Sequence, residues 1–141
     1  MLADGTRFCK LIKPFAHWQF WDAKAEQIHG ISYQSLIDYG EEPVAVCLEL
    51  NELVQGLTLY SDGWVVDHPW LVKLFAQAAV PMLFSISSLE MVLSEPQMAI
   101  WDDEKRAVAQ DCGLARHRAS ADAYIIQQTF LRTQERMLHS Q

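Results

Sequence analysis

His117 and Asp122, near the end of the chain, are the residues whose types and spacing are best suited to chemistry. On one continuous helix, side chains five positions apart point about 140° away from each other. The two can therefore converge only if His117 lies on a loop and Asp122 in the first turn of the helix that follows. Such a pair could combine a carboxylate that holds a hard divalent cation with a histidine that takes a proton from water.

The helix that carries Asp122 is predicted by an apolar stripe with spacings of four and three, in the run that ends near Met137. The stripe consists of Ala119, Ala123, Ile126, Phe130, Thr133 and Met137. Asp122 shares its inward side and needs a partner there, because an unpaired buried charge is costly. Two partners remain open on the residues alone: Arg118, one turn earlier, or a metal ion.

Two further aspartates, Asp62 and Asp67, follow a predicted strand over residues 57–61. Ligand sites in α/β sheets favour the carboxyl ends of strands, so either aspartate could share a cation with Asp122. Each residue also has a structural interpretation. Asp67 is a natural N-cap for a helix that runs to about residue 79, and a histidine such as His117 is more often an ordinary loop residue than a general base. The five tryptophans are expected in the core and at its rim, rather than as a platform for stacked bases.

Strands that alternate with helices in the second half of the chain predict an α/β architecture with crossover connections. Strands are expected over residues 7–13, 57–61 and 81–86, and helices over residues 33–39, 44–54, 69–79, 95–112 and 124–137. The run from Val44 to Val54 fits a strand or a helix, and the helix is chosen because Pro43 and Gly56 bracket it. No repeat or linker interrupts residues 1–141, so a single domain is predicted.

The composition restricts the class of protein. Half of the 141 residues are hydrophobic, which suffices for a globular core, and the net charge of −7 excludes a wholesale basic nucleic-acid binder. Cys9, Cys47 and Cys112 have no metal-binding spacing, and we expect buried thiols in a reducing compartment. No apolar run approaches the length of a membrane span and no secretory signal opens the chain, so a cytoplasmic protein is predicted.

Four segments resemble the motifs of one family, the RNase T and polymerase-proofreading (DEDDh) 3′–5′ exonucleases. The segment HRASADA, from His117 to Ala123, resembles the third motif, in which a metal-binding aspartate follows a histidine by five residues. The segment YSDGWVVDHPWL over residues 60–71 is similar to the second motif. Residues 8–14, followed by IHGIS over residues 28–32, resemble the third strand of the family and the turn after it. The resemblance implies an α/β, RNase H-like (exonuclease) mixed sheet flanked by helices.

The same resemblance implies a site and a substrate. It makes Asp67 and Asp122 the metal-binding carboxylates, with Asp62 as a fallback, and His117 the general base. The cofactors it implies are two Mg²⁺ or Mn²⁺ ions, which stabilise the attacking water and the leaving oxygen. The implied substrate is single-stranded nucleic acid, hydrolysed from its 3′ end.

One family motif has no counterpart in the chain. The Asp-X-Glu motif of the family's first strand is not found before Phe8, so the chain resembles an N-terminally truncated member with impaired metal binding. The alternative function is therefore a non-catalytic binding or self-associating interaction protein. The lost strand would expose a sheet edge, which a rearranged N-terminus, a second copy or another polypeptide would cover. Of these three, a homo-oligomer is favoured.

Overall fold

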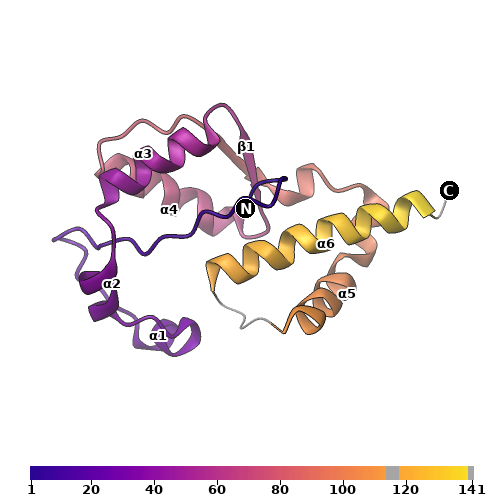
Figure 1. Cartoon of the computed structure of the whole chain (residues 1–141), viewed down its shortest axis with the longest axis horizontal. Helices are drawn as coiled ribbons and strands as arrows, with labels where there is room; N and C mark the ends of the chain where they lie inside the picture. The colour runs from indigo at the N-terminus through magenta and orange to yellow at the C-terminus, as the bar shows by residue number, and fades with distance from the viewer. Residues whose placement is uncertain (114–117, 140–141) are drawn as a thin grey trace. The chain divides into compact units, whose positions relative to one another are not determined.

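The computed structural model describes residues 1–113 and 118–139, and it is mostly helical. Its elements follow one another in the order of Figure 1: α1 (Ala23–His29), α2 (Tyr33–Tyr39), α3 (Pro43–Val54), β1 (Thr58–Ser61), α4 (Trp64–Gln77), β2 (Ser85–Ser88), a short 3₁₀ turn (Leu89–Met91), α5 (Glu95–Cys112) and α6 (Ala119–His139). The strands β1 and β2 pair in parallel, with Thr58 beside Ser85 and Ser61 beside Ser88.

The RNase H-like mixed sheet predicted from the sequence is wrong. Within the described residues the sheet contains two parallel strands and no antiparallel strand, and 61% of those residues are helical. The expected crossover is present, because α4 connects β1 to β2. A mixed sheet would need additional strands, and the segment predicted to supply one does not form a strand.

That segment, residues 7–13, makes a single bridge between Ile12 and Glu41. The main chain of Glu41 forms both hydrogen bonds of the bridge, at 2.8 and 2.9 Å. Pairing cannot extend further, because the next hydrogen bond of the ladder would need an N–H at residue 43, which is a proline, and Pro43 also starts α3. Residues 7–13 therefore form an extended segment that does not become a strand of a sheet.

Helices with clear end signals are where the sequence predicts them. The helical interpretation of residues 44–54 is confirmed by α3, and the predicted helix over residues 95–112 is confirmed by α5. A capping box between Ser94 and Gln97 starts α5, and Gly113 ends it with a left-handed φ of 57°. Ser32 caps α2 in the same way, through a hydrogen bond from the N–H of Ser35.

The second strand begins later than predicted. Residues 81–84 were expected to be strand, but β2 starts at Ser85. The main chain before it is bound by other groups: Asn51 on α3 donates from Nδ2 to the C=O of Pro81 at 2.7 Å and accepts from the N–H of Leu83 at 2.9 Å. The N–H of Gly56 also donates to the C=O of Leu83, at 2.8 Å. These contacts hold the segment against the end of α3.

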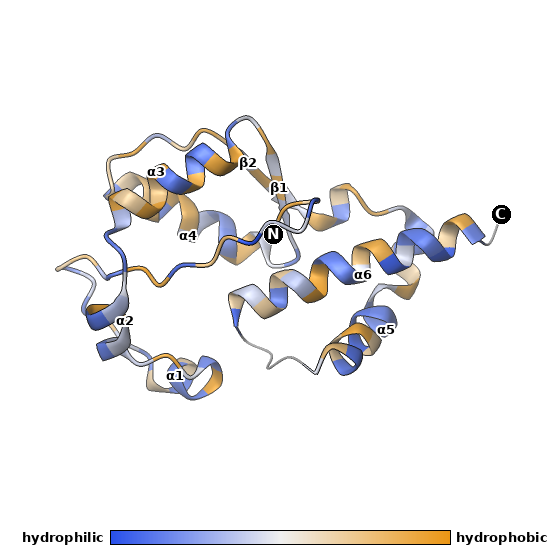
Figure 2. Ribbon diagram, viewed as in Figure 1, coloured by the Kyte–Doolittle hydropathy of each residue, from blue (hydrophilic) through white to orange (hydrophobic). Residues whose placement is uncertain are grey.

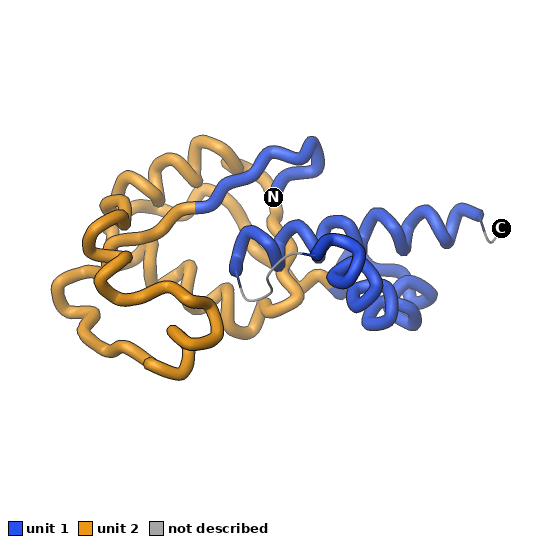
Figure 3. Tube along the Cα trace, turned by 60° about the horizontal axis from the view of Figure 1, so that its bottom comes forward, with its two compact units in different colours: residues 1–9, 90–141 blue, residues 10–89 orange. Residues whose placement is uncertain are grey.

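The chain divides into two compact units, drawn in two colours in Figure 3: unit 1 is Met1–Cys9 with Glu90–Gln141, and unit 2 is Lys10–Leu89. The core of unit 2 lies between α3, α4 and the two strands, and its buried hydrophobic residues include Val46, Cys47, Val54, Leu74, Phe75 and Phe84. Unit 1 is built on the packing of α5 against α6, where Trp101, Val108 and Ile125 are buried. Figure 2 shows both apolar and polar residues along α6. This composition is typical of a helix with one buried and one solvated side.

The N-terminal residues of unit 1 pack on α6. The turn at Asp4 and Gly5 is closed by a hydrogen bond from the N–H of Leu2 to the C=O of Thr6, at 2.9 Å. The C=O of Leu2 also accepts a hydrogen bond from the amide of Gln127, on α6. The hydrogen bond from Gln127 attaches the start of the chain to the first half of its last helix.

The cysteines differ in environment. All three are free thiols: Cys47 is buried in the core of unit 2, Cys112 is half-buried and Cys9 is exposed. The prediction of buried thiols is therefore confirmed for Cys47 and wrong for Cys9. Burial raises the pKa of the Cys47 thiol above its ordinary value, because an apolar environment disfavours the thiolate.

We expect a thiol reagent to modify the native protein at Cys9 first and at Cys47 last. The thiolate is the nucleophile, and Cys47 combines a raised pKa with almost no access to the reagent. Timed alkylation followed by peptide mass spectrometry measures the order, and urea-unfolded protein provides the control in which the difference should disappear. Equal rates at Cys9 and Cys47 in the native protein would contradict the burial of Cys47.

Candidate functional site

Asp67 lies in the first turn of α4, directly after the end of β1. The helix begins at Trp64, with Gly63 at the N-cap position, so the interpretation of Asp67 as the N-cap is wrong. The hydroxyl of Ser61, the last residue of β1, donates to Oδ2 of Asp67 and accepts from the N–H of Gly63 at 2.9 Å. Asp67 is exposed, and its Oδ1 forms no hydrogen bond with any described residue. One carboxylate oxygen is thus held in place and the other can bind a ligand.

Ser61 is a site residue that sequence reasoning missed. It appeared only as the end of a predicted strand, six positions before Asp67. The signal that could have found it is a serine at the carboxyl end of a strand, followed within a few residues by an aspartate in the first turn of the next helix. Asp62, the fallback ligand, is exposed in the same connection between β1 and α4.

Two tryptophans beside Asp67 are more exposed than a core position allows. Trp64 is 39% exposed and Trp70 is 60% exposed, whereas Trp101 is buried at 9%. The ring of Trp64 stacks on His68 at 5.4 Å, and its indole N–H donates to the C=O of Ile86 at 3.1 Å. His68 therefore has an aromatic contact with the residue four positions before it.

Asp122 lies in the first turn of α6, which begins at Ala119. It is half-buried, three residues before Ile125 and seven before Thr129, and both of those residues are fully buried. Asp122 therefore shares the inward side of α6, although the buried stripe runs through residues 125, 129 and 133 rather than through 126 and 130. Its main-chain N–H donates to the C=O of Arg118 at 2.9 Å, as in any first helical turn.

The carboxylate of Asp122 forms no hydrogen bond or ion pair with any residue in 1–113 or 118–139. Arg118, the protein partner that the sequence offered, does not bind it through its guanidinium group. His117, the predicted general base, lies outside the described residues. Asp67 belongs to unit 2 and Asp122 belongs to unit 1. The surroundings of each aspartate are therefore given only by the residues of its own unit.

The two aspartates have the donor atoms that a hard cation prefers. Each offers at least one carboxylate oxygen that no described residue occupies, and Mg²⁺ is usually held by one or two carboxylates together with water and substrate phosphates. Among the described residues, no group of three or more His, Cys, Asp or Glu side chains is gathered as a metal site. Carboxylate oxygens such as those of Asp67 and Asp122 are of the donor type that Mg²⁺ and Mn²⁺ prefer.

No protein-family model matches the chain, and no curated protein or solved structure shows significant similarity to it. Among the helices in the described part of the chain, none is long and apolar enough to cross a membrane.

Proposed function

We propose that the chain is a metal-dependent 3′–5′ exonuclease that acts on the 3′ ends of single-stranded nucleic acid. The proposal is supported by the resemblance of the two aspartate segments to exonuclease motifs. The structural observation that carries it is that Asp122 is a half-buried residue and that its carboxylate binds no described residue. A carboxylate partly withdrawn from water needs a counter-charge, and since Arg118 does not supply one, the proposal assigns a divalent cation.

In this proposal Asp67 and Asp122 hold the cations. When bound, the metal ions would supply charge stabilisation for the attacking water and for the leaving 3′ oxygen. Ser61 positions Asp67, because its hydroxyl fixes one carboxylate oxygen and leaves the other for a ligand. His117 would act as general base and accept a proton from the attacking water. We place this activity in the cytoplasm, where the three free thiols would remain reduced.

We expect Asp122→Asn to weaken Mn²⁺ binding by about 100-fold and to abolish nucleotide release. Asparagine has the same shape but lacks the charge, and changes even to residues that support a metal ligand typically cost 10- to 100-fold in affinity. Calorimetry with Mn²⁺ measures the binding, and a 5′-labelled single strand on a sequencing gel measures removal of nucleotides from the 3′ end. Asp102→Asn is the matched control, because Asp102 is an exposed aspartate on α5 and the change in charge is the same.

Unchanged Mn²⁺ binding by Asp122→Asn would show that the proposal is wrong. Salt-sensitive binding of single strands by the wild-type protein, without cleavage at high enzyme concentration, would favour a non-catalytic nucleic-acid binding protein instead. A protein that binds neither metal nor nucleic acid would be an interaction protein.

A further inference from the structure

The outer edge of β1 carries main-chain groups that point away from its neighbour. The N–H of Ser85 donates to the C=O of Leu57 at 2.9 Å, and Ser85 lies beside Thr58 in the parallel register. Alternate residues of a parallel strand face the same neighbour, so Leu59 and Ser61 also face β2. The N–H and C=O of Thr58 and of Tyr60 consequently face outward, and within the described residues no third strand pairs with them.

The outer edge of β2 is different, because part of it is occupied. In the same register, Ile86 faces away from β1, and its C=O accepts the hydrogen bond from the indole N–H of Trp64. The two edges of the sheet are therefore not equivalent. A side chain binds the outward carbonyl of β2, whereas the outward groups of β1 are available to another strand.

The edge of β1 also lacks the devices that keep edge strands apart. Natural edges are blunted by charged side chains, proline or bulges. The sequence of β1, Thr58-Leu59-Tyr60-Ser61, contains no charge and no proline, and it pairs with β2 without a bulge. The ring of Tyr60 is 43% exposed beside this edge, and Leu57 just before the strand is 47% exposed.

We propose that this edge of β1 pairs antiparallel with the same edge of a second copy of the chain. The outward residues Thr58 and Tyr60 lie symmetrically around Leu59, so a two-fold axis at Leu59 places Thr58 opposite Tyr60 of the second copy. Both such pairs are of the hydrogen-bonded type, in which the two residues exchange two N–H···O=C bonds. A self-complementary patch of this kind is what a two-fold dimer requires.

Charge is compatible with this register. The chain carries a net charge of −7, so self-association requires that its acidic residues avoid one another across the interface. The two-fold at Leu59 places Asp62, one residue beyond the strand, opposite Gly56 of the second copy rather than opposite its Asp62. The proposal concerns an assembly surface and is independent of the nuclease function proposed above.

A charge-swap pair tests both the dimer and its register. We expect the wild-type protein to be dimeric in sedimentation equilibrium. The double variant Thr58→Lys/Tyr60→Lys places like charges opposite each other twice and should dissociate. The double variant Thr58→Lys/Tyr60→Glu places opposite charges there and should remain dimeric, with a dissociation constant at least about tenfold lower than that of the lysine pair. Both side chains are exposed in the single chain, so each variant should keep the fold.

Hydrogen exchange on the wild-type protein gives a second measurement that needs no variant. The amides of Thr58 and Tyr60 should be protected at high protein concentration and lose that protection on dilution. A wild-type protein that stays monomeric at every accessible concentration would overturn the proposal. Equal dissociation constants for the two double variants would also overturn it, since the register predicts opposite effects.

Discussion

Replacement of Asn51 by alanine should lower the free energy of unfolding by about 2 kcal/mol, because two main-chain groups in part-buried hydrogen bonds would lose their partners. The side chain of Asn51 is buried on α3, and its amide binds both the C=O of Pro81 and the N–H of Leu83. Each orphaned group costs about 1–3 kcal/mol when water cannot replace the lost partner. The loss would release the segment that leads into β2, and hence weaken the pairing of β2 with β1.

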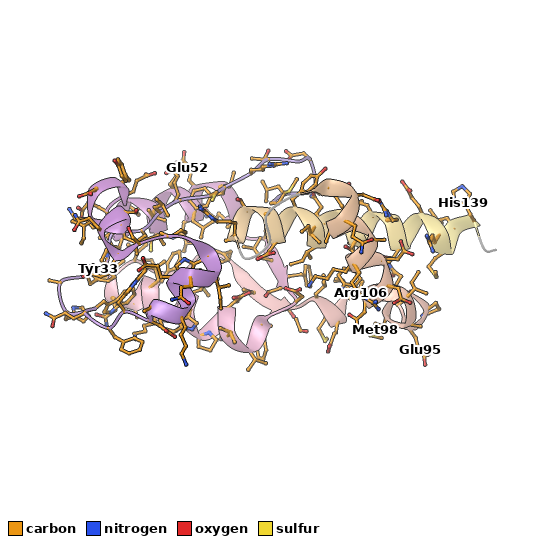
Figure 4. All side chains as sticks on the ribbon, turned by 90° about the horizontal axis from the view of Figure 1, so that it is seen from below. Tyr33, Glu52, Glu95, Met98, Arg106 and His139 are labelled. Carbon is orange, nitrogen blue, oxygen red and sulfur yellow. The ribbon has the colours of Figure 1, made fainter. Side chains whose placement is uncertain are left out.

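Urea unfolding followed by circular dichroism measures this effect, and a neighbouring residue supplies the control. Glu52 is the next residue on α3 and lies on its exposed outer side (Figure 4). Because it has no buried contacts to lose, Glu52→Ala should change the unfolding free energy by less than about 0.5 kcal/mol. A similar small change for Asn51→Ala would show that solvent reaches Pro81 and Leu83, and that the two hydrogen bonds do not hold this segment.

The same residue shows why the sequence predicts helices better than the sheet. The ends of α3 and α5 depend on local signals such as Pro43, the capping box at Ser94 and Gly113, which can be recognised within a few positions. The start of β2 depends on Asn51, which is thirty residues from the carbonyl that it binds. No local pattern before Ser85 contains that information.

The strand predicted over residues 7–13 failed for a related reason. Its composition is suited to a strand, but a strand also needs a partner with several free main-chain groups in succession. The partner it finds is Glu41, which has Pro43 two positions after it, so a single bridge forms. Strand pairing depends on two segments that are distant in the sequence. The apolar pattern over residues 7–13 indicates one of them and carries no information about its partner.

The candidate site was predictable to a similar extent. Helical spacing placed Asp122 on the inward side of the last helix, and the structure shows it half-buried in the first turn of α6. Spacing also placed Asp67 after β1, but not its hydrogen bond from Ser61, because that contact depends on where α4 begins. The expected pairing of His117 with Asp122 stays a prediction.

A buried carboxylate on α5 provides the second large effect on stability. The side chain of Glu104 is 6% exposed, and its Oε1 lies 2.6 Å from Nη1 of Arg136 on α6. Its Oε2 has no hydrogen-bond partner among the described residues, so Arg136 is the group that compensates the charge. Removing one member of a buried ion pair leaves an uncompensated charge. We therefore expect Arg136→Gln to lower the free energy of unfolding by about 2 kcal/mol, less than for a fully buried pair because Arg136 is largely exposed.

The combined variant distinguishes this explanation from a simple loss of packing. If the cost arises from a stranded charge, Glu104→Gln/Arg136→Gln should be more stable than Arg136→Gln alone, because the second change removes that charge. If the cost arises from lost contacts of the arginine side chain, the second change should add to the damage. Arg106→Gln is the control, since the ion pair of Arg106 with Asp103 is exposed on both sides and should contribute less than about 1 kcal/mol. Equal stabilities for Arg136→Gln and Arg106→Gln would mean that water reaches Glu104, and that the interface between α5 and α6 is less closed than its burial indicates.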